Sequence, residues 1–331
     1  MEFTTGGRLE VRITAADTGK RVSVRRLSSS GTPGSLFTDT VGVLTSWDDG
    51  VLSITRKSGE TVRIEESALV AGKVVPAAPA RRRGPAASFE ELAPVLARAW
   101  QPVESERLGT WTLRAAGGFT RRANSALPLG DPGLPLPDAL DRVRAWYAAR
   151  DLPAYVQTAT GAVGTQERLC AELERAGWER EVSAEVRIAA LAPIGDLDAD
   201  VSRVRLARTV DEAWLGRYQR SSAPGAHVLK VLGAGPSVWF ASVPGEGAAP
   251  AAIGRCVVDG RWTGFMAVEV DPARRRQGLA SAVMAALARR ALDEGASAAW
   301  LQVEADNESA RALYDGLGFA THHSYHHFRS R

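Results

Sequence analysis

Short alternations of apolar and polar residues dominate the amino-terminal part of the chain. An apolar residue at every second position is the pattern of a half-buried strand. Five runs show it or a short apolar stretch beside a turn, over residues 9–13, 22–24, 41–44, 51–54 and 62–64. The turns Asp48-Asp49-Gly50 and Lys57-Ser58-Gly59 separate the later runs. Five short strands with tight turns predict a small β-barrel over residues 1–75.

A linker is predicted over residues 76–87, where proline, alanine and arginine replace the alternating pattern. The run from Arg81 to Arg83 has two interpretations. It is a solvated hinge, or it contacts an acidic partner. The sequence leaves both open, and the hinge is the simpler one.

The remaining chain contains a weak internal repeat. Its second copy has a hairpin around Asp259-Gly260, a helix over 281–292, a strand over 299–303, a helix from Asn307 to Gly318, and a strand over 325–329. The first copy repeats this order, with strands at 111–113 and 122–129, a helix over 137–150, a strand over 154–157, a helix over 166–176, and a strand over 181–188. The repeat predicts an α+β protein with two tandem lobes of mixed sheet, over residues 88–192 and 200–331.

Composition narrows the class of protein. The 331 residues are 45% apolar, enough for packed cores, and the formal charge is only +3. A nucleic-acid partner is therefore not expected, since such proteins show a strong basic surface. Cys170 and Cys256 lack metal-ligand spacing and are expected to be buried thiols. No apolar run reaches spanning length and no signal-peptide layout opens the chain, so we expect a cytoplasmic protein without membrane contact.

The strongest chemical signal is a strand, turn and helix start between residues 268 and 281. Val268-Glu-Val-Asp-Pro272 is followed by Arg275-Arg-Gln-Gly278-Leu-Ala280. Amides in the first turn of a helix have no helical acceptor, and the helix dipole is positive there. Gly278 allows close backbone approach and Ala280 is small, while Arg274, Arg275 and Arg276 attract anions. The segment predicts a phosphate-binding loop.

A second motif makes the assignment specific. The run from Asn307 to Phe319 reads Asn-x-x-Ala-x-x-Leu-Tyr-x-x-x-Gly-Phe, with Tyr314 as the tyrosine. This run and Arg275-x-x-Gly278-x-Ala280 together resemble the acetyl-CoA-binding motifs of the GCN5-related N-acetyltransferase (GNAT) superfamily. The resemblance is specific over residues 255–329, weaker over 87–190, and weakest over the barrel, which is similar to SH3-like barrels. The whole layout resembles histone-acetyltransferase-like proteins of actinobacteria and, more distantly, mycothiol synthase.

The resemblance implies an acetyl-CoA-dependent enzyme without a metal. The expected coenzyme contacts are backbone groups of two strand residues, two arginines, the amides of the loop, and the cap of the second helix. These are Val268, Val270, Arg275, Arg276, Gln277, Gly278, Leu279, Ala280, Ser281 and Asn307. Tyr314 takes the position of the family's general acid, which returns a proton to the coenzyme thiolate. In isolation Tyr314 is better explained as a packing aromatic on an amphipathic helix, and the two motifs together favour the catalytic role.

The general base and the acceptor stay open. The acceptor is an amine, on a small molecule or on a protein lysine or amino terminus, and it must lose a proton to attack. Glu269 and Glu304 are candidate bases, although each also fits a surface carboxylate. Related enzymes often carry a glutamate farther upstream, where this chain has Gly264. That departure leaves room for an alternative function, a non-catalytic acyl-CoA-binding regulator whose barrel engages a partner.

The first copy departs from the motifs. Prolines crowd its turn over 130–137, and Pro137 replaces Gly278, Gln166 replaces Asn307, and Leu173 replaces Tyr314. Proline has no amide hydrogen for a phosphate. We therefore predict a degenerate first lobe that serves as scaffold and walls the acceptor pocket.

Histidines and aromatic residues outside the motifs have a structural and a functional interpretation. They are His227, His322, His323, His326, His327, Trp214, Tyr218, Trp239 and Trp262. The four clustered histidines lack the acidic or thiol partners of a metal site and alternate between strand faces. Some of these residues are expected to line the acceptor pocket, but as single residues they fit core positions better.

Overall fold

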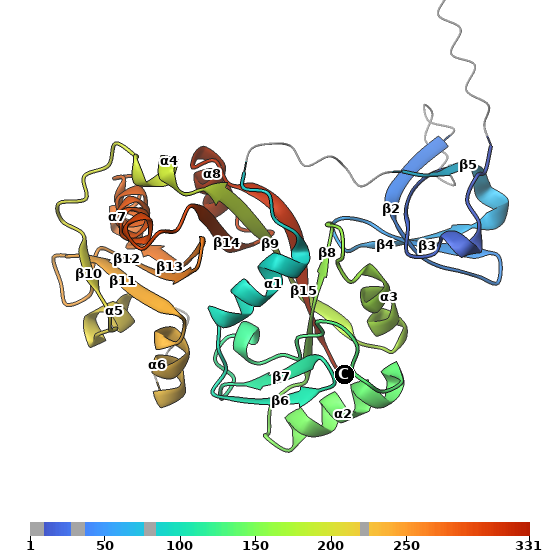
Figure 1. The fold of residues 1–331 in the computed structure, drawn as a ribbon, viewed down its shortest axis with the longest axis horizontal. Coiled ribbons are helices and arrows are strands. Elements are labelled where there is room, and N and C mark those ends of the chain that lie inside the picture. Colours follow the sequence, from blue (N-terminus) through green and yellow to red (C-terminus); the bar gives the residue numbers. More distant parts are fainter. Residues whose placement is uncertain (1–9, 28–36, 76–83, 219–224) are drawn as a thin grey trace, which may run out of the picture.

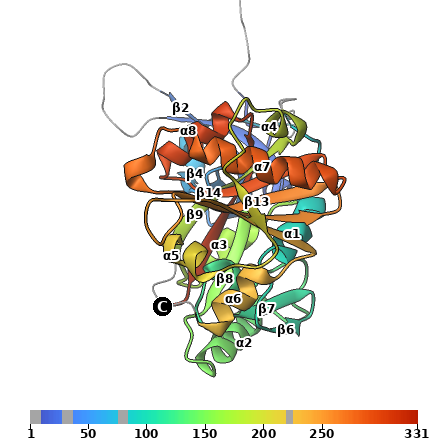
Figure 2. The same ribbon diagram turned by 90° about the vertical axis from the view of Figure 1, so that its left-hand side faces the viewer.

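The computed structural model describes residues 10–27, 37–75, 84–218 and 225–331 (Figure 1). Arg81 to Arg83 lie outside these residues. The chain forms a small amino-terminal sheet, a second and larger sheet shared by two lobes, and helices on both faces of the larger sheet (Figures 1 and 2).

The amino-terminal sheet has five antiparallel strands in the order β4-β3-β2-β1-β5. They are β1 (Arg21–Leu27), β2 (Phe37–Asp48), β3 (Val51–Thr55), β4 (Thr61–Glu65) and β5 (Leu69–Val74), with short 3-10 turns at Ala15–Asp17 and Glu66–Ala68. β4 and β5 lie at opposite edges, so the described residues form an open sheet and not the expected closed barrel.

One predicted strand of this sheet is wrong and another was missed. In the run predicted over 9–13, Val11 makes a single bridge to Gly72, while Ile13 is buried in the core. The fifth strand is β5, which contains Gly72. A Cβ on Gly72 would lie 2.9 Å from the Ile13 side chain, so this strand accepts glycine because the preceding segment packs directly on its backbone.

The first lobe has α1 (Phe89–Arg98), β6 (Glu104–Leu108), β7 (Trp111–Ala115), α2 (Leu136–Ala148), β8 (Tyr155–Thr160), α3 (Glu167–Arg175) and β9 (Glu179–Ala190). The helices and strands predicted after residue 137 are present, but the predicted strand over 122–129 is not. It is replaced by a 3-10 turn at Arg121–Ala123 and two isolated bridges, from Leu127 to Thr112 and from Ala126 to Val156. The Asn124 amide binds the backbone of Ala116, Gly118 and Phe119, and such local bonds compete with a strand ladder.

The second lobe begins after β9. Its elements are α4 (Ala192–Gly195), β10 (Arg205–Ala207), α5 (Glu212–Arg217), α6 (Ala226–Gly233), β11 (Ser237–Val243), β12 (Ala252–Asp259), β13 (Trp262–Val270), a 3-10 turn at Pro272–Arg274, α7 (Leu279–Asp293), β14 (Ala298–Glu304), α8 (Glu308–Gly316) and β15 (Ala320–Arg329). Every element predicted in the second copy is present.

The two lobes share one eight-stranded sheet in the order β10-β11-β12-β13-β14-β9-β15-β8. β9 of the first lobe pairs with β14 from Ala184 to Ala190, and it also pairs with β15. β15 of the second lobe in turn lies between β9 and β8 (Figure 1). Each lobe therefore contributes its last strand to the other, and neither completes its sheet alone.

Besides a first-lobe core that packs α2 and α3 against β8 and β15, two hydrophobic cores lie on opposite faces of this sheet. One is covered by α7 and α8, and the other by α1, α5 and α6 (Figure 2). Alanines dominate the buried face of α7, which lets it approach the sheet closely. A Cβ on Gly254 of β12 would lie 2.5 Å from the Val283 side chain. This close packing sets how near α7 lies to β12.

Arg255 of β12 is fully buried and joins two helix ends. Its guanidinium donates to the carbonyls of Leu232 and Ala234 at the end of α6, and to that of Ala99 at the end of α1. Burial lowers the pKa of Arg255 to about 10, which leaves it charged at neutral pH. A cation at two carboxy-terminal helix ends is favoured by both helix dipoles, so Arg255 needs no carboxylate.

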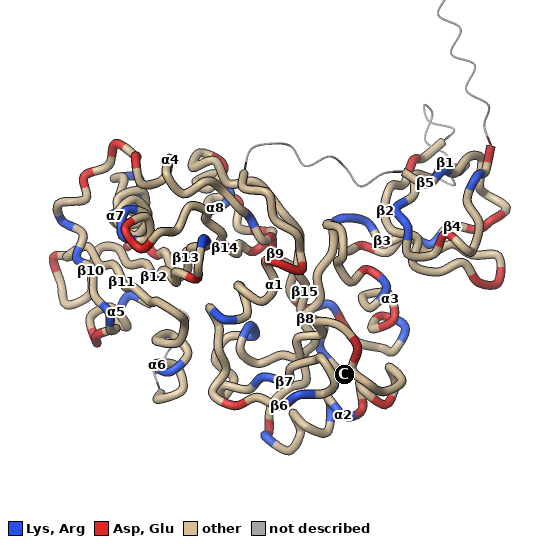
Figure 3. Tube along the Cα trace, viewed as in Figure 1, with Lys and Arg blue, Asp and Glu red and all other residues tan. Residues whose placement is uncertain are grey.

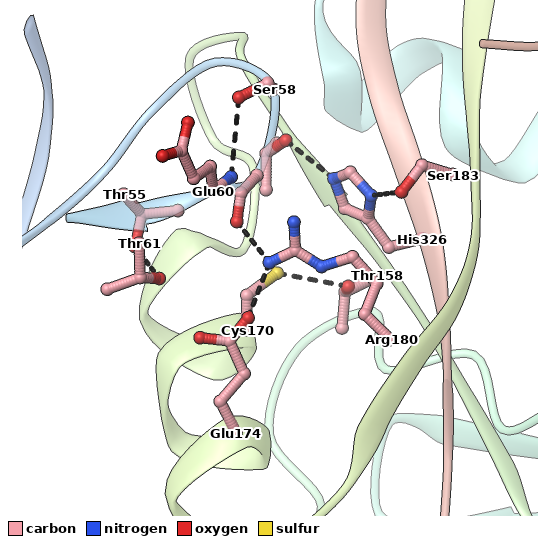
Figure 4. Close-up of polar contacts among 12 residues, drawn as sticks. Thr55, Ser58, Glu60, Thr61, Thr158, Cys170, Glu174, Arg180, Ser183 and His326 are labelled. Atoms are coloured by element: carbon pink, nitrogen blue, oxygen red, sulfur yellow. Dashed lines mark hydrogen bonds and ion pairs between the residues drawn. The ribbon is translucent and has the colours of Figure 1, made fainter. Parts of the chain in front are cut away.

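The amino-terminal sheet contacts the shared sheet through a polar network around His326 (Figure 4). Arg180 of β9 donates to the Gly59 carbonyl, and Thr160 of β8 donates to the Lys57 carbonyl over 3.0 Å. The Thr160 hydroxyl proton is then used, so Nε2 of His326, 2.9 Å away, donates to that hydroxyl oxygen. Nδ1 of His326 accepts from Ser183 over 2.8 Å. The network fixes the neutral Nε2–H tautomer.

Gly59 should be essential for this contact. A Cβ there would lie 2.5 Å from His326 Nε2, and the φ angle of +82° already strains any other residue. We expect Gly59→Ala to release the amino-terminal sheet, seen as a larger radius of gyration in small-angle X-ray scattering. Gly50→Ala is the matched control, because Gly50 has φ +74° but no atom within 4 Å of its Cβ position. If both variants stay as compact as the parent protein, this network does not hold the sheet in place.

Buried histidines should make the fold sensitive to acid. Desolvation, with nearby positive charge, lowers the pKa of both His323 and His326 from 6.5 to about 3. Below pH 6.5 these histidines bind protons in the unfolded chain but stay neutral in the folded chain. The free energy of unfolding therefore falls as the pH falls toward 3. At pH 5 each histidine should lower the free energy of unfolding by ~2 kcal/mol relative to neutral pH. Urea unfolding at pH 7.5 and pH 5 measures this loss. His326→Gln should lower the number of protons taken up on unfolding by about one. An unchanged uptake in the variant would contradict the assignment.

Candidate active site

The start of α7 is open and unfilled by the protein. Gly278 is its cap residue, with φ 74° and ψ 2°, and no side chain caps the helix. Ala282 is the first residue whose amide binds back to the Gly278 carbonyl. The amides of Leu279, Ala280 and Ser281 therefore have no intrahelical acceptor. No atom lies within 4 Å of the Cβ position of Gly278. The opening can accept an anion.

The arginines beside this opening differ in their contacts. Arg274 is tied to Glu246 over 2.9 Å and to Gln277 over 3.0 Å. Arg275 and Arg276 are exposed and make no ion pair within the described part of the chain. Arg276 has φ +62°, a conformation that folds the loop tightly before Gly278. Two cations are thus available to an anion at the helix start.

A strand separation leads into this opening. β13 and β14 run parallel and pair from Trp262 to Phe265 and from Ala298 to Leu301. Beyond Phe265 the two strands no longer pair, although both continue. A bulge accompanies the separation, with Ala267 at φ +51° and a register shift opposite Gly254. The separated strands leave a backbone edge that can pair with an extended ligand.

Val268 and Val270 present their backbone to this gap. The Asp271 amide donates to Ala251 on the β12 side of the strand. Successive residues of a strand direct their amides to opposite sides, so those of Val270 and Val268 point toward β14. Both residues are half-buried. Their position fits the predicted contact with a coenzyme arm.

Asn307 and Tyr314 lie on α8, beyond β14. Asn307 caps the helix by accepting from the Ala310 amide over 3.1 Å. Tyr314 is half-buried and packs on the core beneath α7, with its ring 5.9 Å from that of Phe319 in an edge-on arrangement. The ring therefore has the predicted packing role, and the phenol role stays a prediction.

The two candidate bases flank the strand separation. Leu301 and Val303 belong to the core beneath α7, so Glu304, one residue on, points to the opposite face. Val268 and Val270 also pack on that core, so Glu269 between them points the same way as Glu304. Both carboxylates are half-buried and lie on the face covered by α1, α5 and α6.

Gly264 has a structural reason. A Cβ there would lie 2.2 Å from the Trp300 ring, which occupies this part of the face. A glutamate at this position would collide with Trp300. The base that related enzymes place there must be supplied from elsewhere in this chain, or by water.

The first lobe is closed where the second is open. α2 follows Pro135 and has Pro137 in its first turn, which removes an amide donor. Gln166 uses its side chain internally, donating to the Pro128 carbonyl and accepting from the Ala159 amide over 2.9 Å. Leu173 is fully buried. These residues fit the scaffold role predicted for this lobe.

Most of the remaining candidates occupy core positions, while Trp239, His227 and His322 are half-buried. Trp214, Tyr218 and Trp262 are buried, and Trp239 is half-buried with its indole bound to Glu294. His227 of α6 packs beside Gly117 of the first lobe. His323, His326 and His327 are buried on β15. Within the described residues, no three His, Cys, Asp or Glu side chains are grouped to hold a metal ion. Burial raises the pKa of each cysteine thiol, Cys170 and Cys256, to about 12.

An open helix start beside two separating parallel strands, within a tandem mixed sheet, defines a GNAT-type acetyltransferase. A family model described as "Probable histone acetyltransferase Rv0428c C-terminal" matches residues 87–328, and the chain belongs to this family. It is 28% identical over 306 residues to the probable histone acetyltransferase Rv0428c of Mycobacterium tuberculosis, covering 92% of this chain and 93% of that protein.

Shorter and structural similarities agree with this assignment. A segment of 52 residues, 16% of this chain and 35% of its match, is 42% identical to the ribosomal protein bS18-alanine N-acetyltransferase of Escherichia coli. Two solved structures share the fold. A GCN5-related N-acetyltransferase from Kribbella flavida has a TM-score of 0.53 at 18% identity, covering 74% of this chain and 96% of its own. A tandem GNAT protein from the clavulanic acid biosynthesis pathway has a TM-score of 0.52 at 13% identity. The match covers 75% of this chain and 90% of that protein.

The sequence did not predict α1 or the residues that it covers. Arg114, Arg122, Gln302 and Tyr325 meet beneath this helix, from four separate elements. A signal was present for Arg114, which lies between Leu113 and Ala115 in an apolar run. Their convergence depends on the strand exchange, which periodicity does not encode.

Proposed function

We propose that this protein transfers the acetyl group of acetyl-CoA to an amine. The observation that carries the proposal is the open start of α7, with Gly278 at φ 74°, directly beyond the separated strands. The diphosphate would bind the amides of residues 277–281, with Arg275 and Arg276 adding attraction. The pantetheine arm would lie along β13 and bind Val268 and Val270, whose amides polarise the thioester carbonyl. Asn307 would contact the coenzyme beside α8.

The chemistry needs one proton removed and one supplied. The amine attacks the thioester carbon in its neutral form, so a base or a water chain must take its proton. Glu304 and Glu269, on the face covered by α1, α5 and α6, are the candidate bases. When the carbon–sulfur bond breaks, Tyr314 would protonate the departing thiolate from its phenol. No step requires a metal.

The acceptor is an amine of a small molecule, a protein lysine or a protein amino terminus. Two relatives are named for protein acceptors, histones and the alanine of a ribosomal protein. Within the described residues, basic and acidic residues alternate along the Cα trace (Figure 3), which does not favour a nucleic-acid partner. None of the described helices has the length and apolar character needed to cross a bilayer. We propose a cytoplasmic location.

The test combines coenzyme binding with turnover. Calorimetry with acetyl-CoA should show one site per chain, and thiol release in the presence of an amine panel should show transfer. Binding without transfer to any amine or lysine peptide would favour the alternative, an acyl-CoA-binding regulator. Absence of binding would overturn both.

A further inference from the structure

A cavity outside the proposed coenzyme site lies beneath α1. Its walls come from α1, from residues 122–129, and from β7, β8, β9, β14 and β15. The cavity has a volume of about 450 Å³ outside the protein atoms when its open mouth is included. Its enclosed part is much smaller, since the centre of a water molecule can occupy only about 30 Å³ of it. The closed part thus accepts a group of a few atoms and no more.

The floor of the cavity begins at the strand separation. Gln302 follows Leu301, the last residue of β14 that pairs with β13. In register, Gln302 lies opposite Val186 of β9, and Val186 lies opposite His323 of β15. All three line the cavity. The cavity therefore runs across the sheet from the proposed thioester position toward β8, a distance of ~14 Å for three strand spacings.

Two arginines without a carboxylate partner face this space. Arg114 is 3% exposed and donates to the carbonyl and hydroxyl of Ser125 and to Gln157, at 2.8–2.9 Å. Arg122 donates to the Tyr325 hydroxyl, while its Nε is buried without a hydrogen bond. Neither forms an ion pair with a carboxylate among the described residues.

The arginines make the cavity electropositive. Burial lowers the pKa of Arg114 to about 10, so it stays charged at neutral pH. The guanidinium of Arg122 lies over the rings of Trp100 and Tyr325, at 5.5 and 5.6 Å from their centres. These contacts leave it short of acceptors, in contrast to Arg255, whose donors meet three carbonyls at helix ends. Arg122 is half-buried, and its buried Nε–H lacks an acceptor, which is costly. A bound anion that accepts from this group relieves that cost.

The size and walls of the cavity select the anion. A guanidinium matches a planar carboxylate through paired hydrogen bonds. The remaining walls are largely apolar, with Phe89, Leu96 and Leu127 among them, and do not suit a doubly charged phosphate. We propose that the cavity binds a carboxylate carried by the acceptor, which makes the acceptor a small amine with a carboxylate. This inference rests on the proposed acetyl transfer.

Matched acids and amides test the inference by turnover. The substrates are linear amino acids from 4-aminobutanoate to 8-aminooctanoate, each compared with its primary amide. We expect the acid to be preferred 10- to 100-fold in kcat/KM, chiefly through KM, with the optimum set by chain length. Arg122→Gln should abolish the preference, Arg122→Lys should keep part of it, and Arg142→Gln, which alters an exposed arginine of the same lobe, should not change it.

A binding measurement separates this inference from the acetyl-transfer proposal. Acetate, compared with uncharged acetamide, should shift the NMR signals of the Trp100 indole in the parent protein and not in Arg122→Gln. If coenzyme binds but no amine in the panel reacts, the comparison of acetate with acetamide by NMR tests the carboxylate site without turnover. Equal use of acids and amides, or an acetate effect that persists in folded Arg122→Gln, would overturn the carboxylate site. Loss of coenzyme binding in the parent would instead overturn the proposed function.

Discussion

Replacing Gly278 with valine should weaken acetyl-CoA binding more than any other single change, by at least ~100-fold. The new side chain would project into the space where no protein atom lies within 4 Å, which is the space proposed for the diphosphate. A β-branched residue also disfavours the left-handed conformation, so the loop would shift its amides away from the anion. Two or more charge-assisted hydrogen bonds lost at 1.5–3 kcal/mol each account for a change of this size. Calorimetry with acetyl-CoA measures it.

Gly295 offers the matched control, at the opposite end of α7. It has φ +89° and no atom within 4 Å of its Cβ position. Gly295→Val therefore imposes similar backbone strain on the same helix, and the two variants should lose similar thermal stability. Only Gly278→Val should lose coenzyme affinity. Equal affinity in both variants would mean that the coenzyme diphosphate does not bind at the start of α7.

Tyr314→Phe should lower turnover by ~100-fold or more while leaving coenzyme affinity within about two-fold. The ring packs on the core beneath α7 and against Phe319, and phenylalanine keeps both contacts. The phenol proton is what the variant removes, so the loss should appear in kcat. Thiol release under saturating acetyl-CoA measures turnover, and thermal unfolding verifies that the fold is intact.

A second phenol provides the comparison for this variant. Tyr155 of the first lobe donates to Glu181 over 2.6 Å, away from α8. Tyr155→Phe removes a hydroxyl of the same kind and should leave turnover unchanged. The assignment of Tyr314 as the acid fails if Tyr314→Phe retains parent turnover, and the thiolate would then leave unprotonated or take its proton from water.

The sequence by itself determined the elements of the second lobe from residue 252 onward, but not those before it. Hairpin, helix, strand, helix and strand appear between residues 252 and 329 as their periodicity predicts. These elements are local, since the helix start at Gly278 and the cap at Asn307 depend on residues within one or two turns. The same locality made the candidate coenzyme site predictable. Where local signals conflict, as at Asn124, the predicted strand did not form.

Tertiary structure decided how the lobes join. β9 and β15 are exchanged between lobes, because a strand pairs with any edge that offers matching register and apolar faces. Periodicity states which face of a strand is buried, but it does not name the neighbouring strand. Contacts distant in sequence therefore decided that Trp300 excludes a side chain at Gly264, that α1 covers the same face of the sheet, and that two arginines meet beneath that helix.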